Sequence, residues 1–342
     1  MSIEDVQSRV VADRGATAAG PLLEVADLRV DFRLAGEHVR AVDGLGYTVA
    51  AGRTLAIIGE SGSGKTVSSR AVMGLLPPSA SVSGSIRFEG SELLGLGDKQ
   101  LREHRGSSFA MVFQDPSRSL NPTMRVGKQV TEAVRAHLPL DRAAARERAI
   151  ELLALVRLPA PERRFQEYPH QLSGGMRQRV VIAMALAGNP KLLFADEATT
   201  ALDVTTQAQI MELLADLQRR LGMALVLISH DLGLAASFAD EVVVMYAGRA
   251  VERAPTRKLF ARVRMPYTKA LLDAIPRVER PPHSALPVVP GRPPDLAALP
   301  PGCPFAPRCP NARDRCRDEA PPFSEGEPEH WWACWYPCED RR

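Results

Sequence analysis

The chain has 342 residues, of which 45% are hydrophobic and 24% charged, and its formal net charge is +3. This length suffices for an α/β core with an additional segment, and the aliphatic content excludes a wholly disordered chain. The near balance of charge gives no support to an attraction of the whole chain to nucleic acid, and we expect no nucleic-acid partner. No segment reaches the roughly 20 consecutive apolar residues of a membrane-spanning helix, and the N-terminus lacks the apolar region of a secretory signal, so we expect a cytoplasmic protein.

The expected elements, taken in chain order, describe an α/β domain behind a polar arm. Residues 1–21 are rich in Ala and Gly and are predicted to be loosely ordered. From residue 22 to 275, short apolar runs alternate with helix-compatible segments, which is typical of a parallel or mixed sheet covered by helices. The candidate strands are Leu23–Phe32, Thr54–Ile58, Ser108–Phe113, Leu192–Ala195, Ala224–Ile228 and Val242–Tyr246.

A block without strand signals, residues 126–170, separates the third candidate strand from the fourth. Within it, Asp141–Arg157 carries an apolar stripe at helical spacing and begins with an acidic residue suited to an N-cap. This pattern predicts a helix.

The composition changes after Ile275. Sixteen of the 28 prolines lie in the final 67 residues, and because proline lacks a backbone donor and is excluded from helix interiors, this segment is predicted to be irregular. All five cysteines of the chain also lie there, and clustered cysteines in a cytosolic protein favour a metal site over disulfides. No C-x-x-C pair is present, so the spacing leaves zinc, an iron–sulfur cluster and free thiols open.

A phosphate-binding motif follows the candidate strand Thr54–Ile58, where Gly59–Thr66 reads GESGSGKT. It fits G-x-x-x-x-G-K-[ST] in a strand–loop–helix context, which outweighs the alternative of a glycine-rich turn without a ligand. The backbone N–H groups of such a loop face phosphate oxygens, and the helix start adds the positive end of a dipole. Lys65 is placed to reach the β- and γ-phosphates, and Thr66 to bind Mg²⁺. The residues predicted to contact the nucleotide here are Gly59, Ser61, Gly62, Ser63, Gly64, Lys65 and Thr66.

Two adjacent carboxylates, Asp196 and Glu197, end the apolar run Leu192–Ala195. At the carboxyl end of a strand they suit a phosphoryl-transfer centre, in which Asp196 holds Mg²⁺ and Glu197 polarises the attacking water. If these two residues stood alone, a solvent-exposed strand end would be the better interpretation. Because a phosphate motif lies upstream, the phosphoryl-transfer centre is favoured.

A second anion-binding pattern lies at Leu172–Gln178, which reads LSGGMRQ. Ser173 is a candidate N-cap, and Gly174 and Gly175 leave backbone N–H groups uncovered at a helix start. Because the chain has one phosphate motif, we expect this second site to address a nucleotide held by a partner subunit. An ordinary N-cap turn is the alternative for the isolated pattern.

Together these motifs resemble those of the ATP-binding subunits of ABC (ATP-binding-cassette) transporters. Gly59–Thr66 resembles the Walker A motif, Leu192–Glu197 the Walker B motif, and Leu172–Met176 the family signature, with Met176 where the general signature has Gln. The resemblance covers roughly residues 22–265 and implies an α/β fold, a P-loop ABC-ATPase core with a mixed sheet flanked by helices.

The resemblance also implies a division of the chain. Residues 1–21 would form an N-terminal arm, and residues 22–275 the ATPase domain, with a helical subdomain at about 126–170. Residues 276–342 would form an irregular C-terminal extension of the oligopeptide-transporter type, rich in Cys and Pro.

Further site roles follow from the resemblance. Gln114 corresponds to the Q-loop, which senses Mg²⁺ and water, and His230 to the H-loop, which touches the γ-phosphate. Asp203, in the D-loop Ala201–Asp203, would contact the opposing subunit. Phe32 takes the position of an aromatic residue that stacks on adenine, although a lone Phe on a strand usually belongs to the core. The implied catalytic residues are Glu197, His230 and Gln114, and the implied Mg²⁺ ligands are Thr66, Gln114 and Asp196.

Three strings resemble the peptide and nickel importer branch of the superfamily, and Met176 is common in its D-type dipeptide and oligopeptide permease ATPases. They are Phe113–Pro122, Tyr168–Arg179 and Met265–Leu271. The implied function is ATP hydrolysis that powers import of di- or oligopeptides at the cytoplasmic face of the inner membrane. The implied partners are an F-type ATPase paralogue in a heterodimer, two transmembrane permease subunits and, indirectly, an extracytoplasmic binding protein.

Alternatives remain for the cargo and for the class of protein. Nickel and glutathione importers are related to this branch. A soluble ABC ATPase of DNA repair is disfavoured because the stretch from Lys65 to Ser173 has no room for a long coiled coil and no sustained heptads. Translation-type members carry two cassettes, and this chain has one.

The extension itself resembles the C-terminal region of this branch. That resemblance implies a [4Fe-4S] cluster held by Cys303, Cys309, Cys316 and Cys334, with Zn²⁺ or free thiols as alternatives. Cys338 is expected to be a bystander. Because the phosphate site comes from a separate part of the chain, we expect nucleotide binding to survive loss of the cluster, even if assembly suffers.

Overall fold

Five buried parallel strands form the centre of the molecule, and their carboxyl ends share one edge of the sheet. In the computed structural model, which describes residues 20–34, 37–200, 202–275 and 288–339, the order across this part of the sheet is β9-β3-β8-β7-β6. The strands are β3 (Thr54–Ile58), β6 (Phe109–Val112), β7 (Leu192–Asp196), β8 (Ala224–Ser229) and β9 (Glu241–Tyr246). Nearly all their residues are buried because helices cover both faces, and this explains why they read as continuous Val, Ile and Leu runs. The strands expected from these runs are confirmed within one or two residues.

Three antiparallel strands extend the sheet beyond β9. They are β10 (Arg249–Pro255), β12 (His330–Trp332) and β11 (Ser324–Glu327), in that spatial order. The extension therefore adds two strands to the central sheet, with Glu252 opposite Trp332. The sequence predicts only irregular structure in the extension, because the extension is rich in proline and β12, the aromatic strand that pairs with β10, is short.

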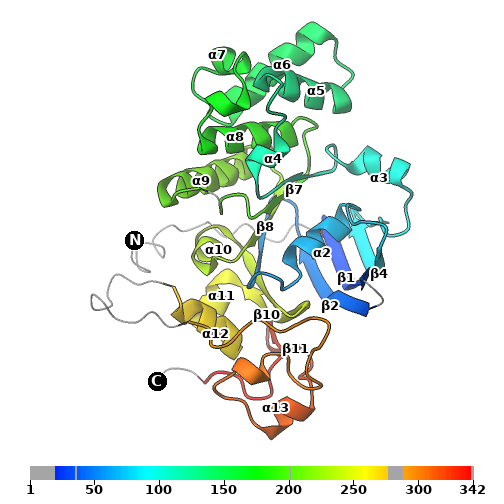
Figure 1. Cartoon of the computed structure of the whole chain (residues 1–342), viewed down its shortest axis with the longest axis vertical. Helices are drawn as coiled ribbons and strands as arrows, with labels where there is room; N and C mark the ends of the chain where they lie inside the picture. The colour runs from blue at the N-terminus through cyan, green and yellow to red at the C-terminus, as the bar shows by residue number, and fades with distance from the viewer. Residues whose placement is uncertain (1–19, 35–36, 201, 276–287, 340–342) are drawn as a thin grey trace.

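A second, antiparallel sheet packs beside the first, near the helix α2 (Lys65–Val72) (Figure 1). Its strands, in the order β2-β1-β4-β5, are β1 (Leu23–Leu34), β2 (Glu37–Val49), β4 (Ala80–Phe88) and β5 (Ser91–Glu92). The sequence predicts β1 and misses the other three. In β4, four exposed or half-exposed serine and arginine side chains interrupt the apolar residues, since one face of the strand meets solvent.

The block between β6 and β7 is helical, as expected. The helix predicted at Asp141–Arg157 is present as α6 (Arg142–Leu155), and Asp141 Oδ1 accepts a hydrogen bond from the Ala144 N–H at 2.8 Å, which confirms the N-cap. The other helices before β7 are α3 (Asp98–His104), α4 (Pro116–Ser119), α5 (Val126–His137), α7 (Pro161–Phe165), the 3-10 turn η1 (Pro169–Gln171) and α8 (Gly174–Ala185).

The remaining helices follow the later strands and the extension. They are α9 (Val204–Leu221), α10 (Leu232–Phe238), α11 (Thr256–Ala261), α12 (Pro266–Asp273), the 3-10 turn η2 (Ala306–Arg308) and α13 (Asp314–Asp318). None of the helices in the described part of the chain is long and apolar enough to cross a membrane.

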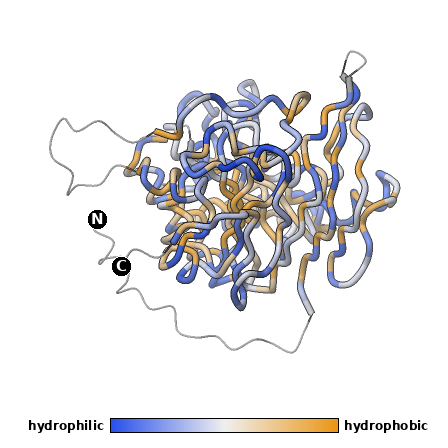
Figure 2. The backbone as a smooth tube through the Cα atoms, turned by 90° about the horizontal axis from the view of Figure 1, so that it is seen from below, coloured by the Kyte–Doolittle hydropathy of each residue, from blue (hydrophilic) through white to orange (hydrophobic). Residues whose placement is uncertain are grey.

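The elements are arranged along one long axis. Figure 1 shows α5–α8 at one end, the parallel strands in the middle and the extension, with β11 and α13, at the other end. Figure 2 shows that the apolar segments concentrate in the centre and the hydrophilic segments at the periphery. The N-terminal arm is largely outside the described residues, as are Ala201 and residues 276–287.

Candidate functional site

The carboxyl edge of the parallel sheet collects four of the predicted site segments. The phosphate loop, Gly59–Thr66, follows β3, and Gln114, Glu197 and His230 follow β6, β7 and β8. Because parallel strands present their carboxyl ends together, residues far apart in the chain meet at this edge. This is the common location of a ligand site in an open α/β sheet.

Close packing requires glycine at two positions of the phosphate loop. A Cβ atom on Gly59 would lie 2.2 Å from the carbonyl oxygen of Met245, and one on Gly64 would lie 2.4 Å from that of Ala41. Gly64 also has a φ of 96°, in the left-handed region that other residues rarely adopt. The loop is thus fixed against two neighbouring backbones, which leaves its N–H groups in a defined arrangement.

Lys65 is buried, and its charge is held by its own loop. Its Nζ donates to the carbonyl oxygens of Gly59 at 2.7 Å and Glu60 at 2.8 Å. Burial lowers the pKa of the ammonium, although the nearby carboxylates of Glu197 and Asp196 favour the charged form. The neighbouring carboxylates thus keep Lys65 charged, and a charged ammonium is the group that binds an anionic phosphate.

Thr66 and Asp196 meet as the two motifs predict. The Thr66 hydroxyl donates to Asp196 Oδ1 at 2.9 Å, and Asp196 is 3% exposed. Burial raises the pKa of the Asp196 carboxyl, while the bond from Thr66 opposes that shift. A hydroxyl and a carboxylate side by side are hard oxygen ligands of the kind that Mg²⁺ prefers.

Glu197 brings together the three predicted catalytic residues. Its Oε2 accepts hydrogen bonds from Gln114 Nε2 at 2.8 Å and from Thr200 Oγ1 at 3.2 Å, and its Oε1 lies 3.9 Å from His230 Nδ1. Its φ of 47° is in the left-handed region, a strained conformation for a residue with a side chain. Such strain is often found at functional positions, and the carboxylate here is held at the sheet edge beside Lys65 and Asp196.

Phe32 does not join this group. It lies on β1, partly buried against the core of the antiparallel sheet, and pairs with Val39 and Ala80 on the neighbouring strands. Its predicted contact with adenine stays a prediction.

The signature residues lie apart from the phosphate loop. Ser173 caps α8, its Oγ accepting from the Met176 N–H at 3.3 Å. Gly175 packs so closely on α9 that a Cβ atom there would lie 2.6 Å from Thr206 Cγ2, and a Cβ on Gly174 would meet Leu202. Within the described residues, no hydrogen bond or ion pair joins this turn to the phosphate loop.

Asp203 lies beside the signature turn. It caps α9 by accepting from the Thr206 N–H at 3.0 Å and from Thr206 Oγ1 at 2.7 Å, and these bonds lower the pKa of its carboxyl. The next residue, Val204, is 82% exposed.

The four cysteines predicted to hold a cluster do converge. Cys303, Cys309, Cys316 and Cys334 line one small pocket together with apolar side chains, and all are free thiols. However, across residues 20–34, 37–200, 202–275 and 288–339, no group of three or more His, Cys, Asp or Glu is arranged to hold a metal ion. The predicted iron–sulfur cluster therefore finds no support in this geometry.

Burial raises the pKa of the Cys303 and Cys309 thiols, and that of Cys334 to about 12. In the absence of a metal these side chains are therefore protonated thiols. Cys338 does not line the pocket, and its N–H donates to the carbonyl oxygen of Arg264.

Sequence reasoning missed a contact between the extension and the phosphate loop. Arg308 donates from Nη1 to Glu60 Oε2 at 2.6 Å and from Nη2 to Glu60 Oε1 at 2.9 Å. The Glu60 N–H donates to Tyr267 Oη at 2.9 Å. No local signal identifies this contact, because Arg308 is a single cation in a proline-rich segment 248 residues further along the chain. The extension and the phosphate loop, which come from separate parts of the chain, are thus in direct contact.

Comparisons with known proteins agree with the fold and with the motifs. The profile of the ABC transporter family matches residues 42–200, and that of the oligopeptide/dipeptide transporter C-terminal region matches residues 251–316. Among solved structures, the chain is 28% identical to the ATP-binding cassette MJ0796, a dimer in a post-hydrolysis state bound to ADP and phosphate. The TM-score is 0.62, covering 69% of this chain and 99% of that one. A cbiO1 protein from Clostridium perfringens, part of the ABC transporter complex cbiONQ, gives 30% identity and a TM-score of 0.60 over 70% and 91% of the two chains.

Curated relatives cover nearly the whole chain. An oligopeptide transport ATP-binding protein, OppD, of Bacillus subtilis is 49% identical over 92% of this chain and 88% of its own length. OppD of Salmonella typhimurium is 47% identical over 96% and 98%. OppD of Mycobacterium bovis is 50% identical over 92% of this chain, which spans about half (52%) of that longer relative.

The chain therefore belongs to the ATP-binding proteins of ABC transporters, within the group whose members carry the oligopeptide/dipeptide C-terminal region. Its fold is the P-loop ABC-ATPase fold, as the motifs predict.

Proposed function

We propose that this chain binds and hydrolyses ATP as a subunit of an ABC importer for di- or oligopeptides. The observation that carries the proposal is the meeting of Lys65, Thr66, Asp196, Glu197 and Gln114 at one sheet edge. This set contains a phosphate-binding cation, oxygen ligands for Mg²⁺ and a carboxylate for water. The names of the relatives, oligopeptide transport ATP-binding proteins, support the peptide cargo.

Each side chain takes one task in hydrolysis. Lys65 and the loop N–H groups hold the β- and γ-phosphates, so the charge that develops on the transferred group is stabilised. Thr66, Asp196 and Gln114 supply oxygen ligands to Mg²⁺, which neutralises phosphate charge when bound. Glu197 accepts a hydrogen bond from the attacking water and aligns its lone pair with phosphorus, and His230 contacts the γ-phosphate.

We further propose that the complete site needs two subunits. The signature turn and the phosphate loop are separate half-sites of one chain, which supports a head-to-tail dimer. In such a dimer, Ser173, Gly174 and Gly175 address the nucleotide of the facing subunit, and Asp203 contacts that subunit. The facing subunit is an F-type paralogue in this proposal, and a solved dimeric cassette with 28% identity supports the pairing.

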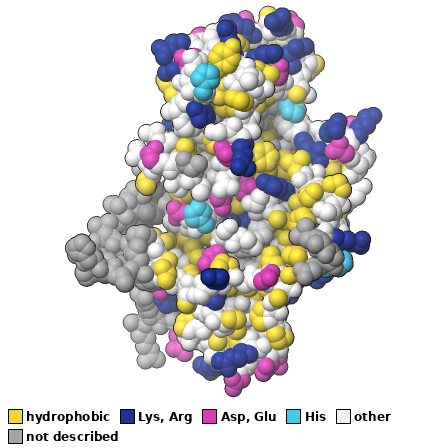
Figure 3. Space-filling view, in the orientation of Figure 1, with side chains coloured by type: hydrophobic (Ala, Val, Ile, Leu, Met, Phe, Trp, Pro, Cys, Tyr) yellow, Lys and Arg dark blue, Asp and Glu magenta, His cyan; other side chains and the backbone are white. Residues whose placement is uncertain are grey.

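Gln114 is the proposed link to two permease subunits at the cytoplasmic face of the membrane. The next residue, Asp115, caps α4, and α4 contacts the signature helix through Arg177 and Ser117. Movement of Gln114 with the γ-phosphate would therefore reach the helical block. Figure 3 shows Lys and Arg side chains gathered at the end of the molecule formed by this block, which suits docking to acidic groups of a membrane partner.

The test is uptake by the reconstituted complex. The chain, its paralogue and both permeases are placed in vesicles with the binding protein, and ATP-dependent uptake of a labelled oligopeptide is measured. Uptake that is lost with Lys65→Ala supports the proposal. Uptake of nickel or glutathione in place of peptides would show that the proposed cargo is wrong. Wild-type subunits that bind no ATP would overturn the proposed function.

For the cysteine pocket we propose a [4Fe-4S] cluster held by Cys303, Cys309, Cys316 and Cys334, with Zn²⁺ as the alternative. The proposal rests on the resemblance of the extension to the C-terminal region of this importer branch; the four cysteines line one pocket but, as placed there, do not form a metal site. Protein purified without oxygen is expected to contain about four iron atoms and four sulfides per chain, a number that follows from the cluster formula. Cys303→Ser should remove the iron and Cys338→Ser should not. One zinc per chain would show that the site holds Zn²⁺ and not a cluster. Protein without any metal would leave four free thiols.

A further inference from the structure

The extension reaches the nucleotide site through Arg308. The two nitrogens of its guanidinium bind the two carboxylate oxygens of Glu60 at 2.6 and 2.9 Å, a bidentate pair. The Arg308 side chain is 5% exposed and that of Glu60 is 23% exposed, so water screens the pair weakly. Glu60 is the second residue of the phosphate loop.

Other contacts hold the guanidinium in place. Its Nε donates to the carbonyl oxygen of Pro290 at 2.6 Å, and Nη1 also donates to Tyr246 Oη at 3.3 Å. The guanidinium carbon lies 5.8 Å from the centre of the Tyr246 ring. Arg308 is therefore oriented before any nucleotide binds, with its charge directed at Glu60.

Glu60 is held from both sides of its peptide. Its carbonyl oxygen accepts from Lys65 Nζ at 2.8 Å, and its N–H donates to Tyr267 Oη at 2.9 Å. The Tyr267 ring packs on Tyr246 and on Phe305 of the extension, with ring centres 4.6 and 5.3 Å apart. The start of the phosphate loop is thus fixed by partners from α12, β9 and the extension as well as by the loop itself.

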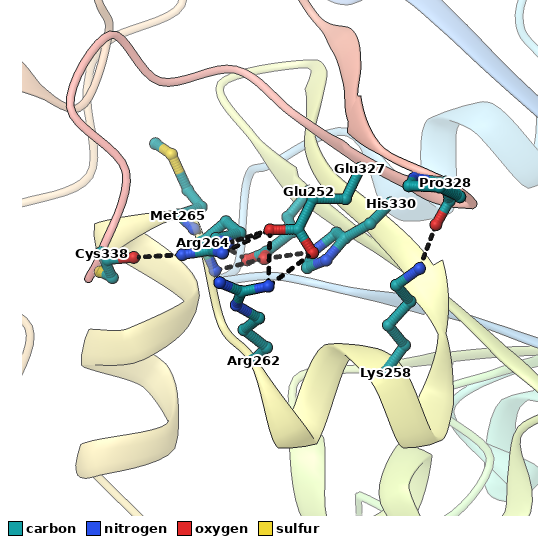
Figure 4. Close-up of polar contacts among 9 residues, drawn as sticks. All are labelled: Glu252, Lys258, Arg262, Arg264, Met265, Glu327, Pro328, His330 and Cys338. Carbon is teal, nitrogen blue, oxygen red and sulfur yellow. Dashed lines mark hydrogen bonds and ion pairs between the residues drawn. The ribbon is translucent and has the colours of Figure 1, made fainter. Parts of the chain in front are cut away.

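The extension is a firm support for these contacts because it is anchored a second time. Figure 4 shows the anchor: buried Glu252 accepts from His330 Nε2 at 2.9 Å and from the Arg264 N–H at 2.7 Å. The Arg264 guanidinium binds Glu327 and the carbonyl oxygen of Cys338. Charged hydrogen bonds that are buried in this way order the segment on which Arg308 lies.

The sign of the charge decides what Arg308 does for nucleotide binding. Glu60 adds a negative charge to a loop that must accept a triphosphate, and its carboxylate is near enough to Lys65 to favour the charged ammonium. Without a counter-charge this carboxylate repels ATP. With Arg308 in place, the pair is neutral and the loop stays in its binding conformation.

We propose that Arg308 is a positioning residue of the nucleotide site: by pairing with Glu60 it cancels a repulsive charge and ties the phosphate loop to the extension. This inference rests on the proposed ATP-binding function and assigns the extension a direct effect on ATP affinity.

The test is equilibrium titration of the full chain with Mg-ATP and Mg-ADP. Arg308→Ala should weaken ATP binding by roughly tenfold, because an unpaired charge near the phosphates acts at low effective dielectric. The loss should be smaller for ADP, which carries less charge, and smaller at high salt. In the double variant Arg308→Ala with Glu60→Gln, most of the ATP affinity should return. Glu60→Gln alone removes the repulsive charge but also loses the bidentate pair, so its ATP affinity should fall less than that of Arg308→Ala.

A merely structural role predicts a different pattern. It would leave the double variant as weak as Arg308→Ala and would affect ATP and ADP equally, and either result overturns the proposal, as does unchanged affinity in Arg308→Ala. Arg308→Lys keeps the charge and loses the bidentate geometry. The ATP affinity of Arg308→Lys should lie between that of wild type and that of Arg308→Ala. If Arg308→Ala fails to fold, Arg308→Lys supplies the measurement. Wild-type protein that binds no ATP would instead remove the proposed function and this inference together.

Discussion

Several contacts hold Glu197 in place. It directly follows the buried strand β7, adopts a left-handed backbone and accepts hydrogen bonds from both Gln114 and Thr200. A carboxylate that is held by donors and lies within 3.9 Å of His230 has little freedom to take another geometry. Such fixed placement is what a group that orients water requires.

Replacing Glu197 by Gln should separate binding from hydrolysis. The variant keeps Lys65, Thr66 and Asp196, so ATP affinity should stay within about twofold, whereas hydrolysis should fall by at least 100-fold, as is typical when a general base is lost. Phosphate release by the assembled complex and nucleotide titration measure the two quantities. Lys65→Ala is the contrast, since it should weaken ATP binding itself. Wild-type turnover in Glu197→Gln would contradict the role given to this carboxylate.

At the scale of elements, the start of α8 is the half-site that we propose to act on the partner's nucleotide. Ser173→Arg places a bulky cation at this helix N-terminus, where it blocks the N–H groups and opposes the helix dipole. In the assembled dimer, hydrolysis at the partner's nucleotide should fall by about tenfold or more. The affinity of this chain's own loop for ATP should not change. If Ser173→Arg instead weakened ATP binding at this chain's own phosphate loop to the same extent, the signature turn would not act on the partner's nucleotide as proposed.

Two N-caps provide a matched comparison for Asp203. Asp141 caps α6 and Asp203 caps α9, each through an N–H three residues on. Replacing either by Ala should cost about 1 kcal/mol of stability in denaturant unfolding. Only Asp203→Ala should also slow hydrolysis in the assembled dimer. If both variants hydrolyse ATP equally well, Asp203 acts as a cap alone.

At the scale of the whole molecule, the extension belongs to the core sheet and is held by buried polar groups. Glu252 is fully buried and accepts from His330 and from the N–H groups of Arg264 and Met265. Glu252→Ala should cost about 3 kcal/mol of stability, because it leaves several buried donors without an acceptor. Proteolysis should then cut residues 288–339 faster. Asp318→Ala, at an exposed carboxylate of the same region, is the control and should change neither quantity.

The parts of this fold that could be predicted are those whose signal is local. The strand β3 matches its predicted range, Thr54–Ile58, because buried parallel strands are uninterrupted apolar runs. Strands with one solvent-exposed face, such as β4, lack an uninterrupted apolar run. The same contrast holds in the site. Thr66 meets Asp196 as the motifs require, whereas Arg308 reaches Glu60 through tertiary packing that no short pattern records.

The pairing of β12 with β10 also determines how the molecule meets other proteins. An unpaired edge strand offers a row of free N–H and C=O groups to any extended chain, and this is a common route to aggregation. Here β12 and the short, exposed β11 cover β10, and the acidic Glu325 and Glu327 lie on the outermost strand. The extension is thus a protective edge for the ATPase sheet, and a chain that lost it would expose β10 to association with its own copies.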